Sequence, residues 1–118
     1  MEPLRLVVAV HGREVKTALF LALNGIQTLD IVATATSTAE LVSYCRAFRP
    51  DVAIVESGLP GRPLDETLQQ LEESGCVGRV LLIDADTPPD FILDLTDAEV
   101  FEDVDHLVAA LPHRKRPR

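Results

Sequence analysis

The stretch Arg49-Pro-Asp-Val-Ala-Ile-Val-Glu-Ser-Gly-Leu-Pro-Gly61 decides the fold of this 118-residue chain. Residues 51–55 (DVAIV) are predicted to form a strand, as is the near-continuous apolar run at 4–10 (LRLVVAV), which is typical of a strand covered on both faces. Pro50 ends the helix expected before it, and residues 56–63 (ESGLPGRP) are rich in glycine and proline, which favours a loop. The stretch therefore predicts a buried strand with a loop at its carboxyl end.

Strands and helices are predicted to alternate on both sides of this stretch. The other predicted strands are 4–10, 29–34, 79–83 and a brief one at 100–101. Helices are expected at 13–24, from a capping box at Ser37–Glu40 through 48, at 64–74 with Gly75 as its cap, at 90–95 as a short stretch, and at 104–111. Five strands that alternate with helices imply right-handed βαβ units, and hence a doubly wound parallel sheet with helices on both faces.

Apolar spacing identifies the side chains expected to face the core. In the first three helices these are Val15, Ala18, Leu19 and Ala22, then Leu41, Val42, Cys45 and Phe48, then Leu64, Leu68 and Leu71. Cys45 and Cys76 sit in apolar contexts, and we expect two reduced, buried thiols in a cytosolic protein.

The net charge of −8 is unevenly distributed, since four basic residues close the chain within 113–118. Residues 1–113 carry seven basic and 19 acidic side chains, a balance of −12. A body this acidic repels a phosphate backbone, so we expect no direct binding of nucleic acid by the domain. Residues 113–118 are interpreted as a basic tail or the start of a linker. No apolar run reaches the ~18–20 residues of a membrane span, and Glu2-Pro3 does not begin a secretory signal, so we expect a cytoplasmic protein with no membrane contact.

With these elements in place, the chain resembles the receiver domain of bacterial two-component response regulators over residues 4–111. The stretch 49–61 follows the third strand of that family and its Pro-Gly loop, with Glu56 at the position of the phosphoaccepting Asp. The resemblance implies a flavodoxin-like, CheY-like (βα)5 fold in a single domain of residues 1–112. The span 84–102 is shorter than is usual in the family, which implies a shortened fourth helix.

The pocket positions of the family all carry substitutions here. Val10 and His11 stand where the family has a pair of acids, Asp84 where it has Thr or Ser, and Glu102 where it has Lys. Mg²⁺ needs several oxygen ligands, which Val10 and His11 do not supply. Asp84 and Glu102 would repel phosphoryl oxygens instead of steadying them. We therefore interpret the chain as a degenerate pseudo-receiver: not an enzyme, with no catalytic residue, metal or cofactor.

Alternatives remain open for the acidic pocket. Glu56 is expected to imitate an aspartyl phosphate, to pair with His11, or to be a solvated acid at a loop. His11 is interpreted as a hydrogen-bonded structural histidine, with pH sensing as the alternative. His11, Glu56, Asp84, Asp86 and Glu102 together would form a cation-binding cluster, or else project separately into water.

The function expected from the resemblance is phosphorylation-independent signalling. The chain would be the N-terminal atypical receiver of a bacterial transcriptional regulator, acting through a protein partner, a homodimer or a ligand. It would reach DNA only indirectly, through an output domain outside this chain. The alternative is an atypical receiver domain of a polar-localisation ATPase of the pilus-assembly or septum-site type.

Overall fold

Strands and helices alternate along the computed structural model, which describes residues 3–24, 26, 28–83, 99–101 and 104–111. The strands are β1 (Leu4–Ala9), β2 (Leu29–Ala35), β3 (Val52–Glu56), β4 (Arg79–Ile83) and β5 (Glu99–Phe101). The helices are α1 (Arg13–Asn24), α2 (Thr38–Phe48), α3 (Leu64–Ser74) and α5 (Val104–Ala110). No helix in this part of the chain is long and apolar enough to cross a bilayer.

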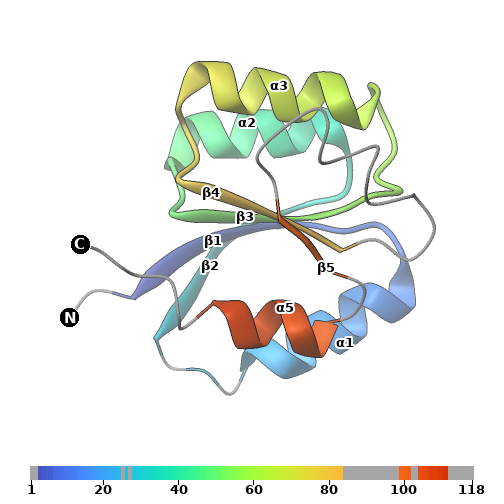
Figure 1. The fold of residues 1–118 in the computed structure, drawn as a ribbon, viewed down its shortest axis with the longest axis vertical. Coiled ribbons are helices and arrows are strands. Elements are labelled where there is room, and N and C mark those ends of the chain that lie inside the picture. The colour runs from blue at the N-terminus through green and yellow to red at the C-terminus, as the bar shows by residue number, and fades with distance from the viewer. Residues whose placement is uncertain (1–2, 25, 27, 84–98, 102–103, 112–118) are drawn as a thin grey trace.

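The strands form one parallel sheet in the order β2-β1-β3-β4-β5 (Figure 1). This is the flavodoxin-like doubly wound order, and it confirms the predicted parallel α/β architecture. Leu6 of β1 pairs with Ile31 on one side and Val52 on the other. The chain places β2 on one side of β1 and then crosses to place β3 on the other side. The strand order therefore reverses between β1 and β3, and the carboxyl ends of these two strands flank the crevice in which such sheets bind ligands.

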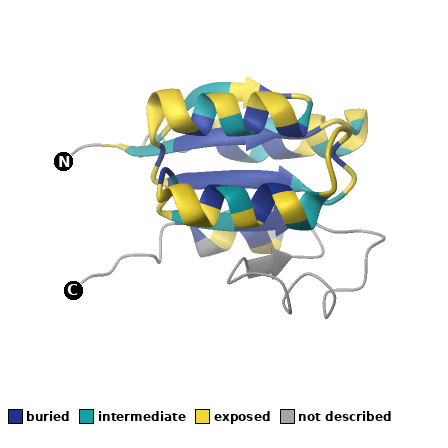
Figure 2. Ribbon diagram, turned by 90° about the horizontal axis from the view of Figure 1, so that it is seen from above, coloured by how far each residue is buried: buried dark blue, intermediate teal, exposed yellow. Residues whose placement is uncertain are grey.

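Helices cover both faces of the sheet, with α2 and α3 on one face and α1 and α5 on the other (Figure 1). Because successive strand residues point to opposite faces, Val7 and Val55 pack in a cluster with Leu41 and other residues under α2 and α3. Leu6 and Ile54 join a second cluster with α1 and α5. The strands are therefore buried between helices whose outer sides are exposed (Figure 2).

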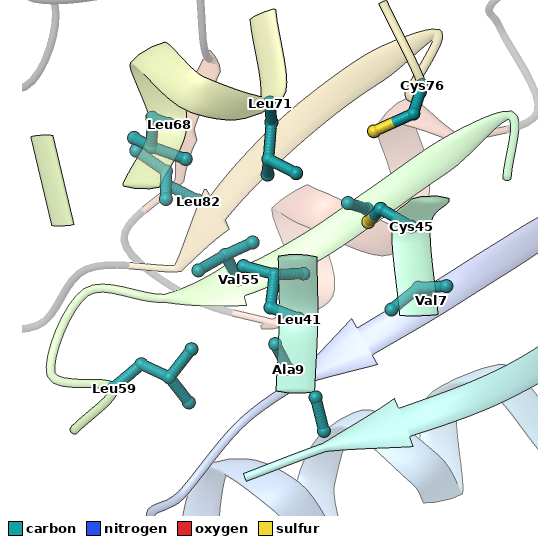
Figure 3. Packing of buried hydrophobic residues seen from close by; sticks show 12 residues of the cluster. Val7, Ala9, Leu41, Cys45, Val55, Leu59, Leu68, Leu71, Cys76 and Leu82 are labelled. Atoms are coloured by element: carbon teal, nitrogen blue, oxygen red, sulfur yellow. The ribbon is translucent and has the colours of Figure 1, made fainter. Parts of the chain in front are cut away.

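The two cysteines lie in the cluster under α2 and α3 (Figure 3). Both are free and buried, as predicted. Burial, and to a smaller extent the nearby Cys76, raises the pKa of the Cys45 thiol to about 12. The folded protein therefore holds Cys45 in its neutral form well above the pH at which an exposed thiol ionises.

We predict that the folded protein loses stability in alkali because of Cys45. Below about pH 8.5 the thiol is neutral in both the folded and the unfolded state. Above that pH it ionises only in the unfolded state, so the free energy of unfolding should fall by up to about 1.4 kcal/mol per pH unit until the folded thiol also titrates near pH 12. Urea unfolding from pH 7 to 10 measures this slope, and Cys45→Ala should flatten it. If the slope in Cys45→Ala equalled that of the unmodified protein, the alkaline loss of stability would not come from the Cys45 thiol.

The helix ends follow the predicted local signals. Ser37 precedes α2, and its Oγ accepts a hydrogen bond from the Glu40 amide at 3.3 Å. The Glu40 carboxylate accepts hydrogen bonds from the amide and the hydroxyl of Thr36. Both bonds lower the pKa of Glu40, and the bond from the amide has the larger effect. Gly75 ends α3 with a φ of 65°, a left-handed conformation that glycine adopts without strain.

Three sequence-based expectations about single residues were wrong. Ala18 is exposed, because the buried side of α1 is defined by Leu19 and Leu23, one helical turn apart. Phe48 is 39% exposed and lies against the Tyr44 ring at 6.4 Å between centroids, instead of entering the core. Glu56 is the last residue of β3 rather than the first of the loop. Its backbone pairs with Ile83, which extends the strand by one residue.

Several sequence-based expectations concern segments outside the described residues. These are the short helical stretch 90–95, the shortened fourth helix and the basic tail 113–118.

Candidate functional site

The candidate site lies where β1 and β3 end, and Glu56 is its central side chain. Two backbone bonds fix this residue at the end of β3: the Ser57 amide donates to Ile83 O at 2.9 Å, and the Leu59 amide donates to Glu56 O at 3.1 Å. The side chain of Glu56 is partly buried and points across the crevice to the loop between β1 and α1.

One oxygen of the Glu56 carboxylate is bound by two backbone amides. Oε1 accepts from the His11 amide at 2.6 Å and from the Gly12 amide at 2.8 Å. Gly12 O accepts the hydrogen bond of Lys16 N at the start of α1. The carboxylate therefore binds amides that immediately precede the first turn of the helix, where the helix dipole also favours a negative charge.

Gly12 leaves the space that the carboxylate occupies. A Cβ added to Gly12 would lie 2.9 Å from Glu56 Oε2. The glycine thus allows the second carboxylate oxygen to approach the backbone closely, and any side chain there would displace Glu56 or shift it.

The contact bears on two of the three expectations for Glu56. Glu56 is not a solvated loop acid, because its carboxylate accepts two charge-assisted hydrogen bonds. It does pair with His11, but through the main-chain amide, while the His11 side chain is exposed. Whether the carboxylate imitates a phosphoryl group stays a prediction.

The donor set at these positions does not fit Mg²⁺. The Val10 side chain is buried among apolar residues of the α1/α5 cluster and has no donor atom. His11 offers an imidazole, a poor ligand for this hard ion, and Glu56 Oε1 already accepts two N–H groups. Among the described residues no group of three or more His, Cys, Asp or Glu side chains could hold a metal ion. Asp84, Asp86 and Glu102 lie outside the described residues, so the predicted acidic cluster stays a prediction.

Thr38 is a structural residue of this edge that the sequence analysis did not identify. Its side chain is 2% exposed, its amide donates to Pro60 O at 2.9 Å, and its Oγ1 accepts from the Arg62 amide at 2.9 Å. Gly61, which lies between Pro60 and Arg62 in the sequence, has a φ of 123°. Thr38 therefore fixes the loop after β3 to the start of α2, just as Glu56 fixes the end of β3 to the start of α1.

We predict that Glu56→Ala lowers the free energy of unfolding by about 1–3 kcal/mol. The variant loses two hydrogen bonds to a charged acceptor, and the His11 and Gly12 amides lose that acceptor. Glu56→Gln keeps an acceptor oxygen but loses the charge, so a smaller loss is expected. Urea unfolding gives the energies, and amide hydrogen exchange at His11 and Gly12 reports the local contact.

A matched control for this experiment is Glu72→Ala, which removes an exposed glutamate from α3. It should change stability by no more than about 0.5 kcal/mol. If the exchange rates of the His11 and Gly12 amides were the same in Glu56→Ala as in the unmodified protein, the hydrogen bonds would be refuted.

The comparisons with known proteins agree on the fold. No protein-family model matches the chain, and no curated protein matches it. Among solved structures it is similar to the signal receiver domain of the response regulator NarL from Mycobacterium tuberculosis, with a TM-score of 0.79, 22% identity, and coverage of 97% of this chain and 100% of that one.

Two further structures show the same similarity. The isolated receiver domain of RcsB from Salmonella enterica serovar Typhimurium has a TM-score of 0.78 and 16% identity, over 98% of this chain and 93% of that one. A DNA-binding response regulator of the LuxR family from Staphylococcus aureus has a TM-score of 0.75 and 16% identity, over 92% of this chain and 96% of that chain. The chain thus has the CheY-like fold of a response-regulator receiver domain.

Proposed function

We propose that the chain is a pseudo-receiver, a signalling module that keeps the receiver scaffold and works without phosphorylation. The observation that carries the proposal is the engagement of Glu56 Oε1 by the His11 and Gly12 amides, at 2.6 and 2.8 Å. The two amides hold the carboxylate against the loop between β1 and α1, which supports a structural role for its charge. Val10, at the position of a metal-binding acid, is instead part of the core.

The setting we propose is the N-terminal atypical receiver of a bacterial transcriptional regulator. It would act through contact with a protein partner, dimerisation or a ligand, and reach DNA through an output domain outside this chain. The solved proteins of this fold include a DNA-binding response regulator of the LuxR family, which supports that setting by analogy of fold. In this proposal Glu56 is a fixed structural anion, not a nucleophile, and the domain catalyses no phosphoryl transfer.

The experiment is incubation with acetyl phosphate and Mg²⁺, followed by intact-mass measurement. A phosphorylatable receiver domain treated in the same buffer serves as the positive control for the reagent. We expect the control to gain one phosphoryl group and this chain to gain none. In a parallel titration, beryllofluoride with Mg²⁺ should leave the amide resonances of residues 10–12 and 56–59 unchanged. A phosphoryl adduct that disappears in Glu56→Gln would refute the proposal.

A further inference from the structure

A cavity of about 250 Å³ lies between α2 and α3, apart from the Glu56 site; it is open to solvent, and Ala39 and Arg62 in its lining are exposed. Its lining residues are Thr38, Ala39, Val42, Arg62, Thr67 and Gln70. The two helices run side by side on one face of the sheet (Figure 1), and the loop that carries Arg62 lies at their amino-terminal ends. We propose that this cavity binds a small organic carboxylate with a short aliphatic chain.

Hydrogen-bonding capacity in the cavity is only partly used. Thr38 Oγ1 accepts from the Arg62 amide at 2.9 Å, and among the described residues its own hydroxyl proton has no acceptor. Thr67, 1% exposed, donates its hydroxyl proton to Pro63 O at 3.1 Å and keeps oxygen lone pairs free. The side-chain amide of Gln70 makes no hydrogen bond within the described part of the chain. A polar ligand would find both donors and acceptors here.

Arg62 sets the charge of the ligand. Its backbone is fixed by the bond from its amide to Thr38, so the side chain starts at the wall of the cavity. Its guanidinium has neither an ion pair nor a hydrogen bond to any other described residue. A guanidinium presents parallel N–H groups that match the two oxygens of a carboxylate.

The volume of the cavity and the smaller, apolar part of its lining set the rest of the ligand. Ala39 and Val42 contribute the apolar surface, which suits a short hydrocarbon chain. The volume of about 250 Å³ is below the roughly 300–1,000 Å³ of pockets that hold drug-sized molecules. A monocarboxylic acid of a few carbons therefore fits the charge, the polarity and the volume.

This inference goes beyond the proposed function and does not depend on it. Binding of a carboxylate between α2 and α3 is compatible with either outcome at Glu56, and it would supply a ligand input to the module. The two experiments fail independently, because one reads a phosphoryl adduct by mass and the other reads binding between α2 and α3.

The test is a titration of the ¹⁵N-labelled 118-residue chain with sodium butyrate at constant ionic strength. Butyramide, which is neutral and of similar size, is the matched ligand control. We expect saturable shifts of the Thr38, Ala39, Thr67 and Gln70 amides with butyrate, and affinity at least about tenfold weaker for butyramide, since the charge-assisted pair is lost.

Variants separate the site from general charge attraction. Arg62→Gln should weaken butyrate binding about tenfold, whereas Arg46→Gln, which removes an exposed arginine of α2 that does not line the cavity, should leave it unchanged. Ala39→Leu should fill the cavity and abolish the shifts, whereas Ala47→Leu, at an equally exposed position of the same helix that does not line the cavity, should not. Each variant must keep the dispersed spectrum of the folded chain.

Three results would overturn the proposal: no saturable shift with butyrate, equal affinity for butyramide, or equal losses in Arg62→Gln and Arg46→Gln. The first would leave a water-filled gap between helices, and the second would mean that the cavity selects apolar shape rather than charge. The third would mean that butyrate senses only the overall charge of the surface.

Discussion

Leu19→Ala should lower the free energy of unfolding by about 2–5 kcal/mol, which is a large share of the stability of a domain of this size. Leu19 of α1 is fully buried in the cluster that joins the sheet to α1 and α5, where Leu107 and Leu111 also lie. The truncation removes buried hydrocarbon and leaves a cavity that the surrounding strands cannot fully close. Urea unfolding followed by circular dichroism measures the loss.

Leu21→Ala is the matched control, because it makes the same chemical change two residues away on the same helix. Leu21 is 74% exposed, so its truncation removes little buried surface, and alanine has the higher helix propensity. The change in stability should stay within about 0.5 kcal/mol. A loss at Leu21 as large as that at Leu19 would mean that α1 packs with its other side against a partner surface, which would contradict the described arrangement.

The fold was predictable because its signals are local and agree with one another. The short apolar run before Glu56 is typical of a strand that is covered on both faces, as in a parallel sheet between helices. Ser37 and Gly75 mark a helix start and a helix end through hydrogen bonds within a few residues, and both act as predicted. The predicted burial of Ala18 and Phe48 was wrong, because helical spacing alone does not say how wide the buried side of a helix is.

The candidate site was predictable in its positions but not in its contacts. Strand order brings Val10, His11 and Glu56 to one edge, and the substitutions at these positions are visible in the sequence. The bond from Glu56 to the amides of His11 and Gly12 spans more than 40 residues and depends on where a loop aims its N–H groups. No pattern of residue types encodes that direction, since backbone donors are the same at every residue except proline.

At Thr38 a short-range sequence pattern, the helix cap at Ser37, coincides with a long-range contact that the pattern does not predict. The adjacent Ser37 explains the start of α2 as a helix cap, and that pattern assigns no role to Thr38. Its buried hydroxyl instead holds the Arg62 amide, 24 residues away. The useful signal was Gly61, because a glycine in a loop of fixed geometry indicates either a positive φ or a close neighbour, and here it has both.

Gly61→Ala should lower the free energy of unfolding by about 2–4 kcal/mol, for two separable reasons. The φ of 123° lies in a region that side chains rarely adopt, so the new residue is strained in any surroundings. A Cβ would also overlap Thr38 Oγ1 and lie 3.3 Å from Thr38 Cβ and N. Gly58→Ala, three residues earlier in the same loop, is the control: in the described structure its Cβ would meet no atom within 4 Å. That change should be neutral or stabilise the protein by up to about 1 kcal/mol.

The same substitution in a Thr38→Ala background separates contact from strain. Thr38→Ala alone should cost about 1–3 kcal/mol, because the Arg62 amide loses its buried acceptor. In that background Gly61→Ala no longer overlaps a hydroxyl, so its additional cost should fall by about 1–2 kcal/mol, while the strain from the positive φ remains. A double-mutant cycle from urea unfolding gives the coupling energy directly. A coupling near zero would show that backbone strain alone excludes side chains at Gly61, and that Thr38 stabilises the loop only through its bond to Arg62.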